Sequence, residues 1–75
     1  MDTKLQRRQF GKRLTEAREA KGLTLSAFAR AVKVAPPTAL GWERGDYSPS
    51  AGSLRRIAGA LDVTVDALLI HDRAA

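Results

Sequence analysis

The stretch between Gly22 and Gly45 constrains the fold of this chain more than any other segment. Each of these glycines follows a run with helical periodicity and suits the left-handed residue that ends a helix. Between them, Thr24 is a natural N-cap. The consecutive Pro36 and Pro37 fit a helix only in its first turn, where neither missing amide would have had a partner. The stretch therefore predicts two short helices joined by a tight turn.

The rest of the chain has the same helical periodicity, and no segment alternates with the period of a strand. Apolar residues recur three and four positions apart, which predicts helices over about 8–21, 24–32, 36–44, 51–61 and 65–69. The 75 residues are enough for one domain at most. We therefore expect an all-α domain of five helices, in which the second and third form a helix-turn-helix.

The expected helix starts differ in their caps. Thr24, Ser50 and Thr64 each offer a side-chain oxygen to a free amide of the first turn, and we expect Ser50 to accept from the amide of Ser53. Ala35 would begin the third helix without such an oxygen and is therefore a poor cap.

Positive charge gathers at the N-terminal end of the chain. The net charge is +5, and residues 1–21 hold seven bases and three acids, whereas the remaining 54 residues hold six and five. We divide the chain into a basic arm (1–9) that leads into the first helix, a helix-turn-helix domain (10–70) and a tail (71–75). Such an arm favours binding to a polyanion, because neutralised phosphates release counterions, although a solubilising terminus would carry the same charge. The cations of this region are Lys4, Arg7, Arg8, Lys12 and Arg13.

The composition argues against several classes of function. The chain has no cysteine, which excludes disulfides and thiolate metal sites and favours a reducing cytoplasm. The single histidine, His71, cannot make a zinc site alone, and the serines and aspartates lack the spacing of a catalytic nucleophile and its partners. The longest apolar run, Ala67 to Ile70, is far too short to cross a bilayer. We expect no catalytic residue, metal, cofactor or membrane partner.

Short motifs follow one another in a fixed order along the chain. They are Leu14 with Arg18, Gly22-Leu23-Thr24, Phe28-Ala29, Trp42-Glu43-Arg44-Gly45, Pro49-Ser50, Leu54, Ala58, Leu61 and Val63-Thr64-Val65. From about Phe10 to Leu69, this pattern resembles the lambda-repressor-like helix-turn-helix family (Cro and phage-repressor type, also called XRE). The resemblance implies a compact five-helix fold and a DNA-binding regulator that is bacterial or phage-encoded, cytoplasmic and nucleoid-associated.

The resemblance also implies an ion pair between Arg18 in the first helix and Glu43 at the end of the third. A guanidinium can hold a carboxylate through two parallel hydrogen bonds and so join the two helices. Such a pair specifies geometry more than it stabilises, because desolvation offsets much of the attraction. Trp42 lies at helical spacing from Ala39, which favours core packing over base stacking.

In this family, the residues that read DNA bases lie at the start and middle of the third helix. The matching positions here are Pro36, Pro37, Thr38 and Gly41, and only Thr38 offers a polar group. The prolines and the Thr38 methyl group are suited to contact thymine methyl groups. Gly41 would let the helix approach the groove closely. We therefore expect weak base readout, with affinity supplied by the basic arm on phosphates or in a narrow minor groove.

A second set of residues is expected to contact DNA phosphates. The family often has a glutamine just after the cap of the second helix, where this chain has Leu25, but the amides at that helix start remain available. The side-chain candidates are Thr24, Arg44, Tyr47, Ser48, Ser53 and Arg55. Each of them can equally be a cap, a loop residue or a solvated charge.

Two turns depart from the family pattern, because Lys33 and Asp62 stand where glycine is usual. If these turns keep a left-handed residue, each non-glycine costs about 1–2 kcal/mol. We therefore predict a positive φ at Lys33.

Two functions remain open. The first is a sequence-specific transcriptional regulator that places its third helix in the major groove of double-stranded DNA, as a homodimer on an inverted repeat with half-sites about 34–36 Å apart. Leu69 and Ile70 extend the apolar surface and form either a dimer contact or the ragged end of the core. The alternative is a protein-interaction module, or an antitoxin-like protein, that retains the fold with weak or no base readout. Salt separates the two, because phosphate binding weakens steeply as salt rises.

Overall fold

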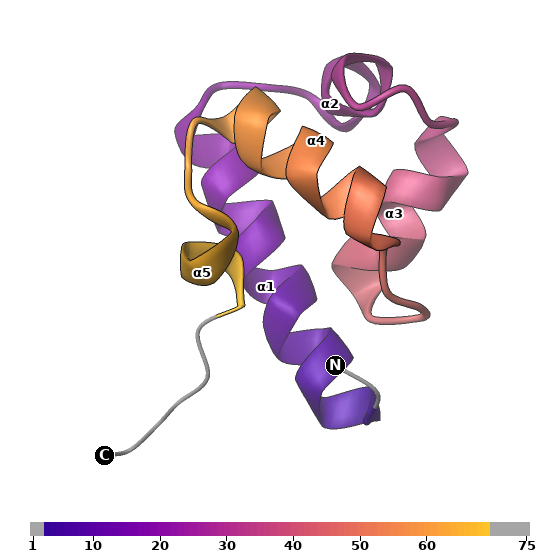
Figure 1. The fold of residues 1–75 in the computed structure, drawn as a ribbon. Helices are drawn as coiled ribbons and strands as arrows, with labels where there is room; N and C mark the ends of the chain where they lie inside the picture. Colours follow the sequence, from indigo (N-terminus) through magenta and orange to yellow (C-terminus); the bar gives the residue numbers. More distant parts are fainter. Residues whose placement is uncertain (1–2, 70–75) are drawn as a thin grey trace.

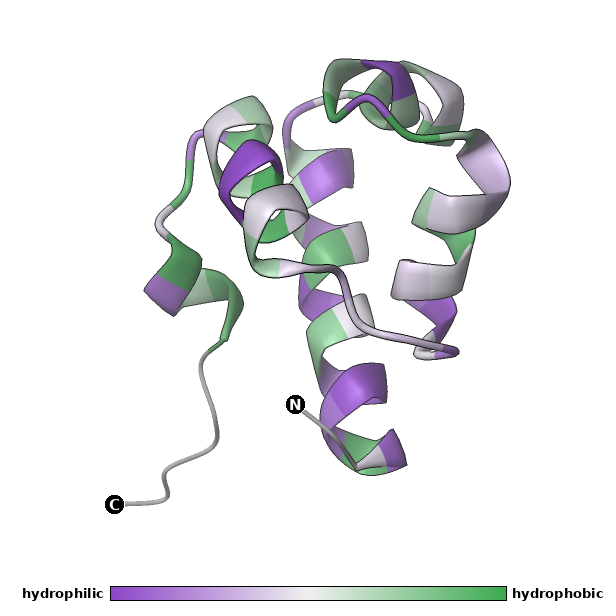
Figure 2. Cartoon of the chain, turned by 45° about the vertical axis from the view of Figure 1, so that its right-hand side comes forward, coloured by the Kyte–Doolittle hydropathy of each residue, from purple (hydrophilic) through white to green (hydrophobic). Residues whose placement is uncertain are grey.

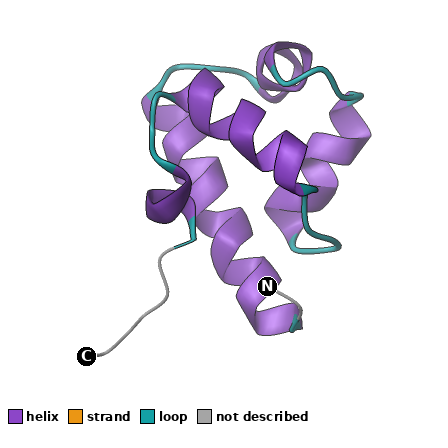
Figure 3. Cartoon of the chain, viewed as in Figure 1, coloured by secondary structure: helices purple, strands orange, loops and turns teal. Residues whose placement is uncertain are grey.

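The computed structural model describes residues 3–69, which form five helices connected by short loops (Figure 1). No strand occurs within this range, as Figure 3 shows. The helices are α1 (Lys4–Ala20), α2 (Leu25–Ala31), α3 (Pro36–Arg44), α4 (Ala51–Leu61) and α5 (Val65–Leu68). The all-α class and the number and order of the helices are those that the sequence predicts.

Local hydrogen bonds explain where the later helices begin. The side-chain oxygens of Thr24, Ser50 and Thr64 each accept from the amide three residues ahead, at 3.0 to 3.1 Å. These are the predicted caps, and Ser50 bonds to the predicted amide, that of Ser53. Ala35 has an extended backbone like the other caps but makes no side-chain bond, and α3 continues from it with two prolines. The predicted contrast between α3 and its neighbours is therefore confirmed.

The start of α1 was predicted wrongly, because the helix begins at Lys4 and not near residue 8. Thr3 is its N-cap. The Thr3 hydroxyl accepts from the amide of Gln6 at 3.1 Å, and the side chain of Gln6 accepts from the amide of Thr3 at 3.4 Å. This reciprocal capping box satisfies two amides that would otherwise lack partners. Residues 4–9 of the expected arm are therefore helical.

Two turns contain a non-glycine residue in the left-handed region. Lys33 has a φ of 63° and Asp62 a φ of 56°, so the prediction for Lys33 is confirmed. In both turns a bond from the following residue closes the preceding helix: the amide of Val34 donates to the carbonyl of Ala29 at 3.0 Å, and Val63 donates to the carbonyl five residues before it at the same distance. These bonds satisfy carbonyls at the helix ends and help to offset the strain.

The core lies between α1, α3 and α4, with α2 and α5 closing its two ends (Figure 1). Figure 2 shows hydrophobic and hydrophilic residues alternating in bands along α1, as expected of a helix with one buried face. Trp42 is only 3% exposed, which confirms its position in the core. The buried apolar residues are Phe10, Leu14, Phe28, Ala29, Val32, Ala39, Trp42, Ile57, Ala58, Leu61 and Leu68.

The close approach of α1 to the end of α3 depends on Gly11. A Cβ atom at this position would lie 2.7 Å from the carbonyl oxygen of Trp42 and would also collide with the carbonyl of Glu43. Both obstacles are backbone atoms, which cannot move aside as a flexible side chain can. Gly11 therefore sets the distance between the two helices.

Candidate nucleic-acid interface

The outer face of α3 is exposed and largely apolar. Pro36 and Pro37 are exposed, Leu40 is 40% exposed, and Thr38 is half-buried. On the opposite face, Ala39 is fully buried against the core. The helix thus presents the predicted reading positions at its start, together with Leu40, a residue that the sequence analysis did not single out.

The first turn of α3 has no unused amide. Pro36 and Pro37 have no N–H group. The amides of Thr38 and Ala39 both donate to the carbonyl of Ala35, at 2.9 and 3.3 Å. The start of α3 therefore presents carbon atoms and the Thr38 side chain, but no free backbone donor.

Gly41 is covered by an aromatic ring of this chain. Its expected role was to let α3 approach DNA closely, but the residue is buried, and a Cβ atom built on it would collide with the phenol of Tyr47. Tyr47 follows α3 in the chain and folds back over it. Its hydroxyl donates to the carbonyl of Pro37 at 3.4 Å, and the residue is 46% exposed. The space beside Gly41 on α3 is thus filled by Tyr47.

The C-terminal end of α3 is joined to α1 by the ion pair between Arg18 and Glu43. Arg18 Nε lies 2.6 Å from Glu43 Oε2, and Nη2 lies 3.3 Å from Oε1, so the contact is bidentate. The third nitrogen, Nη1, donates to the carbonyl of Leu23 at 2.7 Å. The two side chains are only 13% and 8% exposed. The hydrogen bonds to Glu43 raise the pKa of Arg18 against the opposing effect of burial.

A second arginine of α1 contacts the same end of α3. Arg7 Nε donates to the carbonyl of Gly45 at 3.0 Å across 38 positions of sequence, and Arg7 is half-buried. Gly45 ends α3 in the left-handed region with a φ of 80°. Arg7 was expected in the basic arm, but it lies between α1 and the end of α3.

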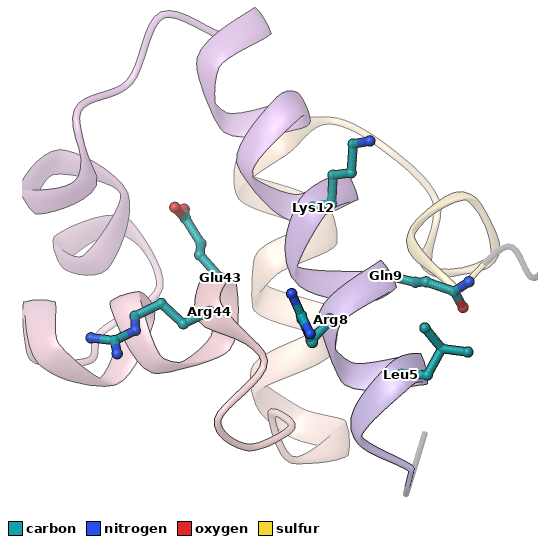
Figure 4. Close-up of a pocket in the computed structure, with 6 residues that line it drawn as sticks. All are labelled: Leu5, Arg8, Gln9, Lys12, Glu43 and Arg44. Carbon is teal, nitrogen blue, oxygen red and sulfur yellow. The ribbon is translucent and has the colours of Figure 1, made fainter.

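Two further cations of α1 line an open hollow next to α3 (Figure 4). Arg8 and Lys12 come from successive turns of α1, and Arg44 comes from the end of α3; all three are exposed. The hollow has a volume of about 560 Å³. Its other lining residues are Leu5, which is 65% exposed, Gln9 and Glu43. Three positive charges therefore lie along one side of the molecule.

Two further cations occupy other surroundings. Lys4 is exposed at the first position of α1. Arg13 is half-buried, and its Nη1 donates to the carbonyl of Gln9 in the same helix at 3.4 Å. The five cations of the expected arm thus do not form one continuous set.

The expected phosphate contacts fall into two groups. Ser53 is only 7% exposed; its hydroxyl accepts from Ser50 and from Arg56, both at 3.1 Å, so its expected place on the surface is corrected. Thr24 is exposed, but its hydroxyl oxygen already caps α2. The remaining candidates are exposed side chains: Arg44, which lies 3.8 Å from Asp46, together with Tyr47, Ser48 and Arg55.

Arg56 has a structural role that the sequence analysis missed. Its Nε donates to the carbonyl of Val32 at 3.0 Å, which joins α4 to the end of α2. No local pattern could have indicated this contact, because the two residues are 24 positions apart.

The expected dimer contact can be followed only in part. Leu69 is half-buried and packs against the core. Ile70, His71 and the rest of the tail lie outside the described residues. Within residues 3–69, no cluster of metal-ligating side chains is found, and no helix combines the length and apolar character needed to cross a membrane.

Comparison with known proteins identifies the fold. The helix-turn-helix model HTH_3 matches residues 14–68. The structure of the restriction-modification controller protein C.AhdI from Aeromonas hydrophila is 34% identical, with a TM-score of 0.79 over 83% of this chain and 94% of that chain. The clp gene regulator ClgR from Corynebacterium glutamicum is 33% identical, with a TM-score of 0.80 over 84% of this chain and 67% of that chain.

A third structure, of an HTH_3 family transcriptional regulator from Vibrio cholerae, is 29% identical, with a TM-score of 0.78 over 87% of this chain but 36% of that chain. No curated protein sequence matches the chain. The matched region spans the C-terminal part of α1 and all of α2 to α5, and the resemblance read from the sequence is confirmed. The chain therefore belongs to the HTH_3 family of XRE-type helix-turn-helix proteins.

Proposed function

We propose that this protein is a sequence-specific transcriptional regulator that inserts α3 into the major groove of DNA. Membership in the HTH_3 family, together with the similar structures of gene regulators, supports a DNA-binding regulator in general terms. The proposal depends on two features of α3. Its outer face is exposed, and Arg18 holds its C-terminal end through Glu43. A helix that enters the groove needs both a free face and a fixed direction.

The start of α3 is the proposed base-reading surface. Pro36, Pro37 and the Thr38 methyl group offer apolar contacts that suit thymine methyl groups. Such contacts discriminate modestly, because they reject a base only by loss of packing. We expect half-sites with thymines opposite the start of α3.

Phosphate binding is assigned to the exposed cations beside α3. Arg8 and Lys12 of α1 and Arg44 of α3 lie around one hollow, and Arg55 is exposed on α4. Each neutralised phosphate releases counterions, so affinity should fall steeply with salt. Arg7 is left out of this set because it contacts the carbonyl of Gly45.

The protein is proposed to act as a homodimer. Two copies related by a two-fold axis would place their α3 helices in successive major grooves, about 34–36 Å apart. Leu69, at the end of α5, is the described residue through which we place the contact. The operator should then be an inverted repeat.

A second candidate function, a protein-interaction module, is favoured by the composition of the same face. Pro36, Pro37 and the 40% exposed Leu40 make an apolar surface that would suit a protein partner as well as DNA. Binding through this surface would be nearly independent of salt, whereas binding to phosphates would not.

Selection from random duplex DNA at near-physiological salt tests the proposal. The selected duplex is then compared with a scrambled one by fluorescence anisotropy over a range of salt. An enriched inverted repeat supports a specific regulator. Equal affinity for both duplexes would contradict base readout, and absence of binding would favour the interaction module.

Two variants sharpen this experiment. Thr38→Ala removes the methyl and hydroxyl groups from the reading surface and should lower affinity for the selected duplex more than for the scrambled one. The double variant Arg8→Ala with Lys12→Ala should weaken binding to both duplexes equally and reduce the salt slope by about two. An equal loss on both duplexes in Thr38→Ala, or a loss confined to the selected duplex in the double variant, would contradict these assignments.

A further inference from the structure

Tyr47, which is 46% exposed, brings a hydroxyl group beside the reading positions of α3. Pro36 and Pro37 have no polar side-chain atoms, Gly41 has no side chain, and Thr38 is half-buried. Direct readout of a base requires a donor or an acceptor. The phenol of Tyr47 lies over Gly41 and is attached to α3 through its own hydrogen bond.

We infer that the Tyr47 hydroxyl reads a DNA base in place of an α3 side chain. Residues four apart lie one above the other on a helix, so Pro37 and Gly41 share one side of α3. The ring of Tyr47 covers Gly41, and its hydroxyl reaches back to the carbonyl of Pro37. A side chain from the loop thus occupies the place that a longer residue at position 41 would take. This inference rests on the proposed insertion of α3 into the major groove.

The direction of the hydrogen bond predicts which bases are read. A tyrosine hydroxyl has one proton and can accept through its lone pairs. The proton of Tyr47 is donated to the carbonyl of Pro37, so the oxygen is left as an acceptor. In the major groove, adenine and cytosine present amino donors, whereas guanine and thymine present acceptors at the equivalent positions. Tyr47 should therefore select adenine or cytosine at one position of each half-site.

The ring and the hydroxyl have separable roles. The ring and the hydroxyl oxygen both lie beside Gly41, and a phenylalanine would keep the ring in this place. The bond from the hydroxyl to Pro37 is long and the residue is 46% exposed, so loss of the hydroxyl should cost little stability. Tyr47→Phe therefore removes the reading group and keeps the ring over Gly41.

The test compares two hydroxyl deletions on the selected duplex. In Tyr47→Phe, the ratio of affinities for the selected and scrambled duplexes should fall about tenfold, with affinity for the scrambled duplex unchanged. Thr38→Val removes the other hydroxyl, keeps the methyl group that contacts thymine, and should change the ratio by less than about twofold. Equal thermal unfolding of Tyr47→Phe and the wild type checks that the packing is intact.

Base analogues then locate the contact. Purine replaces adenine, or 2-pyrimidinone replaces cytosine, one position at a time, which removes the amino group. At one position, the analogue should weaken wild-type binding by the same factor as Tyr47→Phe and should not weaken the variant further. Gly41→Ala, whose added Cβ collides with the ring, should displace Tyr47 and lose the same discrimination.

Several outcomes would overturn the inference. An equal loss on both duplexes in Tyr47→Phe would mean that the hydroxyl contacts a phosphate. No loss on either duplex would mean that the ring is only a spacer. If wild-type protein selects no sequence, the proposed function itself fails and the inference fails with it. If wild type and Tyr47→Phe select the same sequence with the same ratio, the inference alone is overturned.

Discussion

The two ends of α3 are built in opposite ways. At its C-terminal end, Arg18 and Arg7 of α1 hold Glu43 and the carbonyl of Gly45 at distances of 2.6 and 3.0 Å. At its N-terminal end, Ala35 provides no side-chain cap, and exposed prolines form the first turn. One end is held by charged groups from a distant helix, and the other is free of such contacts. The direction of α3 is therefore fixed at the end that lies farther from its proposed reading positions.

The largest effect on stability is expected when the partner of Arg18 is removed. Glu43→Ala would leave a guanidinium only 13% exposed without its carboxylate, which should destabilise the protein by about 3 kcal/mol. Urea denaturation measures the loss. The matched control is Glu19→Ala, because Glu19 lies 3.9 Å from the same guanidinium but is 66% exposed, and it should cost less than about 0.5 kcal/mol. Equal losses in the two variants would mean that the buried pair does not hold α3.

A smaller test separates two neighbouring arginines of α1. Arg7→Ala loses the bond to the carbonyl of Gly45 and should cost about 1.5 kcal/mol, measured by the same denaturation. Arg8→Ala removes an exposed charge and should cost less than about 0.5 kcal/mol. For affinity to DNA we expect the reverse order, with Arg8→Ala more strongly impaired. If both variants change stability equally, Arg7 belongs with the arm after all.

The smallest test strengthens the free end of α3. Ala35 already has the extended backbone of a cap, with φ −71° and ψ 148°, close to the φ −68° and ψ 166° of Ser50. Ala35→Ser should therefore accept from the amide of Thr38 and raise stability by about 0.5–1 kcal/mol. Ser50→Ala, the matched loss at α4, should lower it by about 1 kcal/mol. A destabilised Ala35→Ser protein would show that the prolines leave no room for a cap.

Features determined by near neighbours in the chain were predictable from the sequence. Thr24 and Ser50 cap the helices that they were expected to cap, and Lys33 takes the left-handed conformation that its turn requires. The start of α1 was missed because the capping box between Thr3 and Gln6 lies in a polar segment without apolar periodicity. A periodic pattern locates a buried face and does not reveal a helical turn beyond the core.

The candidate site was less predictable because its contacts join distant parts of the chain. The types of residue at the start of α3 were known, but the covering of Gly41 by Tyr47 depends on how the loop folds back. Arg7 was grouped with its neighbours by charge, whereas its partner lies 38 positions away. Charge and spacing identify which residues are candidates for DNA contact. Only the tertiary structure separates the candidates that stabilise the fold from those that lie at the surface.

The lack of free amides in the first turn of α3 affects how the protein would move along DNA. A helix start with free N–H groups holds a phosphate and so fixes its position along the duplex. In α3 the two prolines have no such group, and the amide of Thr38 is bonded to Ala35. We expect this helix to slide past non-target base pairs with little resistance from the backbone, so that dwell time on a site depends on the few atoms that face its bases.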